Sequence, residues 1–493
     1  MCTVNTRAEI KSTNPAVTRS VFLDDGGRSG RFVWKWGDYF AKVAADPREG
    51  IFIASDLIPS TVGAWVREAG YFVSGVSIRW LGAEPASAPE ETTAAIQSAM
   101  NICAFVGAGK TVVPGDTWHV SKTQTETYQA RGMPQGKGDY YALRVPSGVM
   151  LEGEGFLSIL KRMVPEPLLI VLCAETVGSK CTNLRVDGNH REFPIFGETY
   201  GSGAGVFVES GTGSEDRNNL FDTIWVQDTP GYGMGVEWGN HRGLVIKNIF
   251  ITGTGSDGID IKRMNSGAFD AHAIVLDTII VEDFGRTATD GMQAGVDLRG
   301  YFTASNIHVR GFGAQARSGI RFRGGIEADG VIGAMRSSLT GFRVEKASDV
   351  EQTTYGLEIN CDYVSATDGA VDGCTENVSF VLAGKATSAS GVALTNVKSF
   401  NAETYGFRVR KEFRGTRLTN CSDIQTKTVT NNAGFRIEGT DTKLNSPYVR
   451  ALPGLTSAII ISSTAKNTGI VQPSFEGAAA VNIRDYGLDT VVL

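Results

Sequence analysis

Short segments of alternating apolar and polar residues return throughout this chain, and many of them open with a glycine. The clearest examples begin at Gly235, Gly258, Gly295 and Gly319. Alternation with a period of two predicts a half-buried β-strand whose apolar side chains face a core. The residues predicted to face the core are Val236, Ile259, Val296 and Ile320. Because the segments recur at intervals of roughly two to four dozen residues, they predict the stacked coils of a solenoid.

A second apolar pattern lies between these segments. It reads Ile249-Phe-Ile, Ile279-Ile-Val, Ile307-His-Val and Phe342-Arg-Val. Each coil therefore contributes at least two strands, and the alternation continues almost to the last residue. We predict an all-β solenoid of roughly a dozen coils, in which each coil contacts only its neighbours.

The first part of the chain differs in composition. Residues 16–82 contain four of the seven tryptophans, in short strand-like runs separated by glycine and proline. They predict a small β module, which would serve either as a connector or as a plug over the first coil. We therefore expect two domains, an N-terminal connector or cap module at residues 1–82 and the solenoid at residues 83–493.

A helix is expected between these two parts. Residues 89–104 begin with acidic side chains, which favour a helix N-terminus. Apolar Ile96, Met100 and Cys103 fall on one side of such a helix. This amphipathic segment predicts a short helix that caps the solenoid.

Composition and charge exclude several classes of function. The formal net charge of −6 argues against nucleic-acid binding, which depends on clustered Lys and Arg. No apolar stretch is long enough to span a membrane, and the first fifteen residues lack the apolar region of a secretory signal. The seven cysteines are scattered and odd in number, which is typical of reduced thiols.

Three stretches resemble a known family. Gly27-Arg-Ser-Gly-Arg-Phe-Val-Trp34 and Gly63-Ala-Trp-Val-Arg67 resemble a segment that precedes pectate-lyase-like β-helices in phage tailspikes and related bacterial proteins. The run from Gly109 to Ser121 is similar to the opening strand pair of that superfamily, although Trp118 replaces the usual tyrosine.

This resemblance implies a right-handed, single-stranded parallel β-helix that depolymerises a bacterial surface polysaccharide or exopolysaccharide. It also implies a homotrimer whose N-terminal module attaches to a phage tail or baseplate. The expected location is then a virion tail, or the outside of a cell after lysis.

The glycine segments, once aligned, place charged residues in columns on the outer face of the solenoid. One column holds Glu237, Asp260, Asp297, Arg321 and Glu358, and the next holds Gly239, Lys262, Arg299, Arg323 and Asn360. Like charges stacked about 4.8 Å apart destabilise a sheet, so this arrangement requires nearby cations or a function. A structural ladder of alternating charges and a catalytic site both stay open at this point.

The catalytic interpretation rests on glycoside hydrolysis, which needs two carboxyl groups a few ångströms apart. Asp260 and Asp297 on adjacent rungs are the leading pair, with Glu237 and Asp257 as alternates. Asp257-Gly-Ile-Asp260 also resembles the paired aspartates of some tailspikes and of galacturonase-like hydrolases. The residues expected to bind substrate are Lys262, Arg263, Arg299, Arg321, Trp225, Trp238 and Tyr301.

Three alternatives remain. A polysaccharide lyase would use the same Lys and Arg residues on a uronic acid, and a carbohydrate-binding fibre protein would need no catalysis. Asp290, Glu327 and Asp329 are acids in loops that could replace the column.

Although the column could in principle hold a calcium ion, we predict neither a metal nor another cofactor. Outward Trp225 and Phe250 suit either a sugar or a partner subunit.

Overall fold

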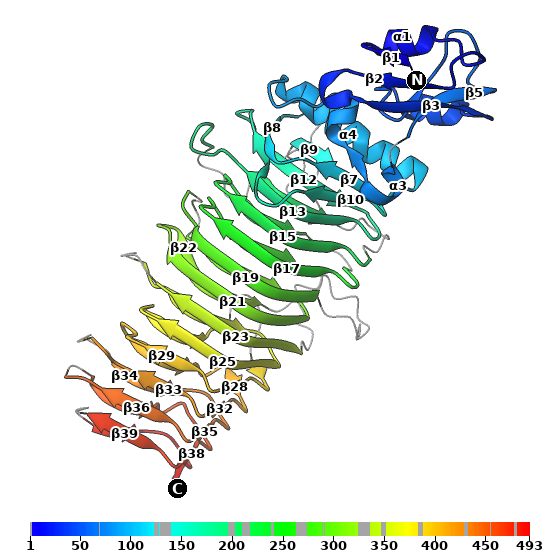
Figure 1. Cartoon of the computed structure of the whole chain (residues 1–493). Helices are drawn as coiled ribbons and strands as arrows, with labels where there is room; N and C mark the ends of the chain where they lie inside the picture. Colours follow the sequence, from blue (N-terminus) through cyan, green and yellow to red (C-terminus); the bar gives the residue numbers. More distant parts are fainter. Residues whose placement is uncertain are drawn as a thin grey trace.

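Two long parallel sheets wind most of the chain into a stack of coils (Figure 1). The structure, a computed structural model, describes residues 2–68, 70–122, 128, 140–195, 203–209, 217–237, 241–262, 274–287, 289, 291–323, 336–346, 352–382, 388–427, 432–453, 455–477 and 481–493. The coils form an elongated body with the N-terminal module at one end and the C-terminus at the other (Figure 1).

Sheet 1 is the longer of the two and has 21 strands among the described residues. Its strands are β6 (Val76–Ser77), β7 (Lys110–Val113), β8 (Asp116–Val120), β10 (Met150–Gly153), β11 (Ser158–Arg162), β13 (Lys180–Asp187), β15 (Leu220–Gln227), β17 (Val245–Thr252), β19 (Ile274–Phe284), β21 (Phe302–Phe312), β23 (Ser337–Glu345), β25 (Val364–Asp372), β28 (Ala393–Thr395), β29 (Lys398–Phe400), β32 (Arg417–Thr419), β33 (Ser422–Ile424), β35 (Lys443–Asn445), β36 (Tyr448–Ala451), β38 (Gly469–Val471), β39 (Ser474–Gly477) and β41 (Val491–Val492). A short separate pair is formed by β27 (Ala389–Ser390) and β31 (Phe413–Arg414).

Sheet 2 has 13 strands in the described part of the chain, and it contains the glycine segments found in the sequence. Its strands are β9 (Tyr140–Arg144), β12 (Leu168–Ala174), β14 (Ala204–Glu209), β16 (Tyr232–Val236), β18 (Ile259–Lys262), β20 (Gln293–Arg299), β22 (Ala316–Arg323), β24 (Tyr355–Asn360), β26 (Glu376–Phe380), β30 (Tyr405–Val409), β34 (Ala433–Ile437), β37 (Ser457–Ile461) and β40 (Val481–Asp485). Every pairing within sheets 1 and 2 is parallel, which confirms the predicted parallel β-helix.

The long strands of sheet 1 from β13 to β25 bend at a residue in the left-handed region near their middle, and β19 and β21 have a second such residue near their end, Asp283 and Gly311. In β17 the mid-strand residue is Asn248, at φ +53°, and in β21 it is Asn306, at φ +55°. The equivalent residues of the stack, here called the bend column, are Asn183, Thr223, Asn248, Thr278, Asn306, Gly341, Asp368, Asn396, Asn420, Ser446 and Gln472. Asn, Asp and Gly tolerate this conformation best, and they fill most of the column. Neighbouring bends are also linked, since Asn248 Nδ2 donates to Asp222 at 2.8 Å and Asn420 Nδ2 donates to Asn396 at 3.3 Å.

The glycines recur because the interior leaves no room for a side chain there. The glycine row, defined as Gly205, Gly233, Gly258, Gly295, Gly319 and Gly356, stacks in register through sheet 2. A Cβ atom at any of these positions would lie closer than 3.0 Å to a Val or Ile side chain of sheet 1. For Gly258 that side chain is Val281, and the Gly295 carbonyl oxygen would be at 2.5 Å.

The N-terminal module is a five-stranded sheet in the order β1-β2-β3-β5-β4. Its elements are β1 (Cys2–Val4), α1 (Arg7–Ser12), β2 (Ser20–Leu23), η1 (Gly26–Arg28), β3 (Gly30–Trp36), α2 (Phe40–Ala45), β4 (Phe52–Ile53) and β5 (Gly63–Arg67). It has a core of its own, in which the Trp34 and Trp65 rings meet edge to face at 5.4 Å.

The module is joined to the solenoid through buried side chains. Arg67 is 3% exposed and donates to the carbonyl oxygens of Gly50, Ser29 and Arg28 at 2.6, 3.0 and 2.7 Å. Its guanidinium also lies 4.8 Å from the ring of Trp80, which packs against the solenoid core. Between the module and the cap lie α3 (Tyr71–Ser74) and η2 (Ile78–Leu81). The two-domain division at residue 82 stays a prediction.

The predicted cap is present as α4 (Pro89–Val106). Proline occupies its first position, acids fill its first turn, and Gly107 ends it at φ +69°. Ile96, Met100 and Cys103 are buried in the solenoid core, as the amphipathic pattern predicted. No helix in the described part of the chain is long and apolar enough to cross a membrane.

Candidate active site

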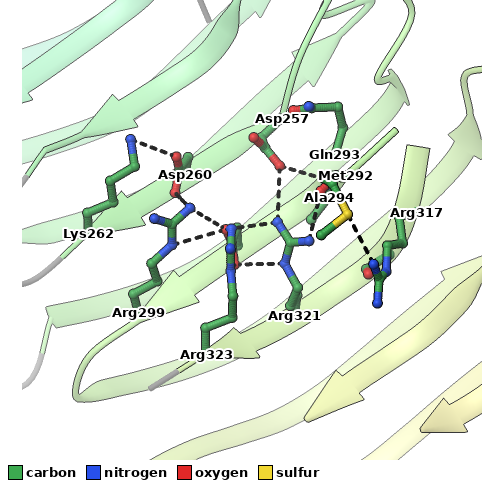
Figure 2. Close-up of polar contacts among 12 residues, drawn as sticks. Asp257, Asp260, Lys262, Met292, Gln293, Ala294, Arg299, Arg317, Arg321 and Arg323 are labelled. Carbon is green, nitrogen blue, oxygen red and sulfur yellow. Dashed lines mark hydrogen bonds and ion pairs between the residues drawn. The ribbon is translucent and has the colours of Figure 1, made fainter. Parts of the chain in front are cut away.

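The charged columns lie on the outer side of the middle coils, where sheet 2 is crossed by a network of ion pairs (Figure 2). The register places Asp260, Asp297, Arg321 and Glu358 on consecutive strands, as predicted. Lys262, Arg299, Arg323 and Asn360 form the next column, also as predicted. These outward residues are nevertheless covered, since Asp260 is 1% exposed, Asp297 0% and Arg321 2%.

Glu237 is not in the column where the sequence alignment placed it. Met234 pairs with Ile259 and Val236 with Ile261, so Gly235 is level with Asp260. Glu237 follows Val236 and therefore comes level with Lys262. The error arose because Gly233, and not Gly235, belongs to the glycine row.

Asp297 lies at the centre of the network and is held by three arginines. Arg321 Nη2 and Arg299 Nη2 are each 3.0 Å from its Oδ2, and Arg323 Nε donates to its Oδ1 at 3.0 Å. Arg323 Nη2 also contacts Oδ2. Burial alone would raise the pKa of Asp297, but Arg321, Arg323 and Arg299 outweigh it and hold the pKa well below its usual range. The three arginines therefore favour the ionised form of this carboxylate.

Asp260 is equally buried but has fewer partners. Lys262 Nζ is 3.1 Å from its Oδ2 and Arg299 Nη2 is 3.4 Å from its Oδ1. Among the described residues neither oxygen accepts a hydrogen bond of good geometry. Burial raises the pKa of Asp260, whereas Arg299 and Lys262 lower it by more, so the carboxyl stays ionised. Asp260 therefore carries a charge with lone pairs still available.

Asp257 lies in the same coil and has the opposite tendency. It is 5% exposed and accepts a hydrogen bond from the Ala294 backbone N–H at 2.5 Å. Its nearest cation is Arg321, at 3.9 Å. Burial, with the neighbouring charges of Asp260 and Asp297, raises the pKa of Asp257 from 3.8 to about 7. This carboxyl is the one that can hold a proton near neutral pH.

Glu237 and Lys262 complete the N-terminal side of the network. Lys262 Nζ donates to Glu237 Oε1 at 2.5 Å and lies 5.2 Å from the centre of the Tyr232 ring. Burial raises the pKa of Glu237 and Lys262 partly opposes that rise. Burial would lower the pKa of Lys262, but Asp260, Tyr232 and Glu237 hold it well above its usual value.

Several participants were not identified from the sequence as site residues. Arg323 clamps Asp297, Arg317 lies 3.7 Å from Glu358, and the Ser318 hydroxyl donates to the same carboxylate. The Met292 carbonyl oxygen accepts from Arg321 Nη1 at 2.7 Å (Figure 2). Arg323 could have been found from its column, whereas the backbone contacts leave no signal in a sequence.

Some predicted site residues are not brought to this network. Trp225 lies on β15 of sheet 1 and contacts Phe156, Phe250 and Thr252 there. Tyr301 follows β20, and its carbonyl oxygen accepts from the Ile274 N–H at 3.2 Å. The residues that fall outside the described part of the chain are Trp238, Arg263, Asp290, Glu327 and Asp329.

Within the described ranges, no group of three His, Cys, Asp or Glu side chains is arranged to hold a metal ion. The carboxylates that could converge on a cation are occupied by Lys and Arg instead, Asp297 by three guanidinium groups and Glu237 by Lys262.

The chain was compared with known proteins. No protein-family model matches it, and no curated protein sequence is detectably similar. Among solved structures, the A-module of mannuronan C-5 epimerase AlgE4 from Azotobacter vinelandii aligns with 85% of this chain and 99% of its own, at 16% identity and a TM-score of 0.50.

Two phage proteins also align. Pre-mature gene product 12 of bacteriophage phi29 matches 85% of this chain and 56% of its own, at 13% identity and a TM-score of 0.55. Tailspike gp49 of the Acinetobacter baumannii phage Fri1, a capsular polysaccharide depolymerase, covers 97% and 75%, at 10% identity and a TM-score of 0.46. Strand order and parallel pairing, together with the alignments to the epimerase A-module and to phi29 gene product 12, show that the chain has the parallel β-helix fold.

Proposed function

We propose that the protein binds a polysaccharide and cleaves it by hydrolysis at the carboxylate network of sheet 2. The observation that carries the proposal is the contrast between Asp257, which can hold a proton near pH 7, and Asp260, which stays ionised beside it. Pairs of acids whose surroundings separate their pKa values supply an acid and a base at one pH. The fold is one on which polysaccharide-acting proteins are built, as the compared structures' names state.

The two carboxyls take different roles in this proposal. Asp257 donates its proton to the glycosidic oxygen as the bond from that oxygen to the anomeric carbon breaks. Asp260 either accepts a proton from the attacking water, which inverts the anomeric carbon, or attacks that carbon first, which retains its configuration. Asp297 positions Arg299 and Arg321 and takes no proton itself.

An acidic sugar suits the charge of this network. The cations are Lys262, Arg299, Arg317, Arg321 and Arg323, and the carboxylates left ionised when Asp257 is protonated are Glu237, Asp260, Asp297 and Glu358. One positive charge is therefore in excess. The same observation favours a second candidate, a lyase, in which a uronic acid carboxylate would be neutralised by these cations.

Both carboxyls are at most 5% exposed, so substrate binding must also open the outer face of sheet 2. We include this opening in the proposal. A network that never opens would act only as a structural charge ladder.

The test is incubation of the purified protein with capsular, O-antigen and exopolysaccharide preparations. Saturated oligosaccharides indicate a hydrolase, unsaturated products that absorb ultraviolet light indicate a lyase, and binding without shortening indicates a fibre protein. Asp257→Asn and Asp260→Asn should each lower the rate by several powers of ten while the fold persists.

The matched control is Asp423→Asn, which removes another fully buried carboxyl far along the stack, in β33. It should leave the rate unchanged. Near-normal cleavage by both Asp257→Asn and Asp260→Asn would show that the network is structural.

We further propose that the protein is a homotrimer attached to a phage tail through its N-terminal module. The support is the shared fold with a phage protein and the contact of Arg67, whose guanidinium lies 4.8 Å from the ring of Trp80, a residue packed against the solenoid core.

A further inference from the structure

A group of aromatic side chains lies on the outer side of sheet 1, away from the carboxylate network. Trp225 on β15 and Phe250 on β17 are in register, and the Phe156 ring lies 5.8 Å from Trp225 and 6.3 Å from Phe250. Phe250 is 38% exposed. These three residues are called the aromatic patch.

The Trp225 ring is fixed in place by polar neighbours. Arg185 lies over it, with the guanidinium carbon 4.3 Å from the ring centre, and the indole N–H donates to Thr252 Oγ1 at 3.3 Å. Arg185 also donates to Gln227, whose amide donates to Asp187 at 2.8 Å. A chain of planar hydrogen-bonding groups therefore borders the aromatic patch.

Beside the patch is a pocket of about 500 Å³. It is lined by Asp187, Asn189, Arg191, Glu192, Gln227, Asp228, Thr252, Gly253 and Asp283. Gln227 and Thr252 each follow an aromatic residue of the patch by two positions on the same strand, so they project from the same face. Pocket and patch thus form one continuous surface, here called the sheet 1 surface.

We propose that the sheet 1 surface binds a segment of neutral, hydroxyl-rich polysaccharide. Sugar rings present apolar faces that pack on aromatic rings, and hydroxyl groups that pair with carboxylate, amide and guanidinium groups. The pocket acids Glu192, Asp228 and Asp283 lie within 3.8 Å of the cations Lys161, Arg191 and Arg286, so the charges nearly balance and the pocket suits the hydroxyl groups of a neutral sugar. This inference takes only its ligand class, a polysaccharide, from the proposed function. The sheet 1 surface retains the polymer and does not cleave it.

A second copy of the chain is the other possible occupant, and the lining argues against it. The centre of a subunit interface is depleted of charged residues. Here Asp187, Asp228 and Asp283 line the pocket together with Thr252, which accepts the hydrogen bond from Trp225 of the aromatic patch. A partner chain would have to bury these carboxylates, whereas a glycan would satisfy them.

The test measures retention of the full-length protein on an array of purified capsular, O-antigen and exopolysaccharides. Every protein carries Asp257→Asn, so that cleavage does not remove the ligand. Trp225→Ala and Asp187→Ala should each weaken retention on at least one neutral polysaccharide by about tenfold or more. Trp225→Phe should restore part of it. The control is Trp36→Ala, which removes a tryptophan that is 51% exposed in the N-terminal module.

Three outcomes would overturn the inference. One is retention by Trp225→Ala and Asp187→Ala that equals that of the parent protein, and another is no retention of the parent on any polysaccharide of the array. The third is a change of oligomeric state on Trp225→Ala with retention unaltered, which would make the patch a subunit contact. Cleavage assays of the same substitutions without Asp257→Asn test the hydrolytic proposal separately. A failure of the sheet 1 proposal can then be told apart from a failure of the hydrolytic proposal.

Discussion

Asp257 and Asp260 are three residues apart in one coil, yet their surroundings move their pKa values in opposite directions. Both are fully desolvated, so the difference comes from the cations, which lie at 3.1 and 3.4 Å from Asp260 but at 3.9 Å from Asp257. Coulomb energy at such distances in a buried site is large, so small displacements decide which carboxyl is protonated.

This contrast predicts the pH dependence of polysaccharide cleavage. The acid Asp257 must be protonated, so kcat/KM should fall as pH rises above about 7. Asp260 has a pKa below its usual 3.8, so the fall on the acid side should begin only below that pH. The charge of Asp297 helps to raise the pKa of Asp257. The fall of kcat/KM at high pH should therefore begin at a lower pH in Asp297→Asn than in the parent protein. If Asp297→Asn does not change the pH at which kcat/KM begins to fall, the assignment of Asp257 as the acid is contradicted.

A second buried acid predicts how stability depends on pH. Asp423 points into the coil interior, where Ser399 Oγ donates to it at 2.6 Å and Gln425 Nε2 at 2.9 Å. Burial raises its pKa from 3.8 to about 7. A raised pKa gives stability that is fully present below pH 3.8 and is lost as pH rises through about 7.

We expect Asp423→Asn to remove this dependence. The free energy of unfolding of the variant minus that of the parent protein should be larger at pH 8 than at pH 5. Thermal unfolding across this range measures the difference, and parallel curves for the two proteins would show that Asp423 is ionised at every pH tested.

At the residue scale, the sequence predicted which residues face outward but not what surrounds them. The column of Asp260, Asp297 and Arg321 could be predicted because alternation and glycine spacing fix which residues face outward. Their burial could not, since it depends on what covers the outer face. The inward Asp423 was missed because its strand is only three residues long and shows no alternation.

At the scale of the element, the glycine row explains both the success and the failure of the alignment. Glycine marks the start of a strand because Val or Ile of the opposite sheet fills the space of a side chain. The segment at β16 has glycines at both Gly233 and Gly235, two residues apart, and period-two alternation cannot choose between them. Glu237 was therefore placed level with Asp260, two residues away from its observed position level with Lys262.

The row predicts that Gly258→Ala will be destabilising. The new methyl group would meet Val281 and the Gly295 carbonyl oxygen, and overpacking of this kind typically costs about 1–3 kcal/mol. Gly469→Ala is the matched control, because an added Cβ there meets nothing closer than Lys443 Cγ at 4.0 Å.

A double substitution tests the cause. If Val281 is the obstacle, adding Val281→Ala to Gly258→Ala should cost less than the two separate losses combined. Unfolding in denaturant gives all four free energies. Strict additivity would mean that the backbone contact, and not Val281, sets the cost.

At the scale of the whole molecule, the predicted homotrimer remains to be measured. Apolar Val275 and Tyr363 are 37% and 44% exposed on the sheet 1 side of the stack, which suits lateral packing of coils. Light scattering at micromolar concentration should give three times the mass of one chain. A mass equal to one chain across a dilution series would rule the trimer out.

The bend column also determines how much of the sequence the fold needs to specify. In the middle coils, the backbone requires residues that tolerate a left-handed conformation, a glycine of the glycine row and apolar residues that fill the core. Each of these coils therefore specifies its shape with few residues, and its other positions are left unconstrained by the backbone. Outer-face residues can therefore diverge, coil by coil, while the backbone that displays them is copied unchanged. Where outer-face residues of neighbouring coils are linked, as Asp297 is to Arg321 and Arg323, a substitution in one coil also changes the charge balance of the next.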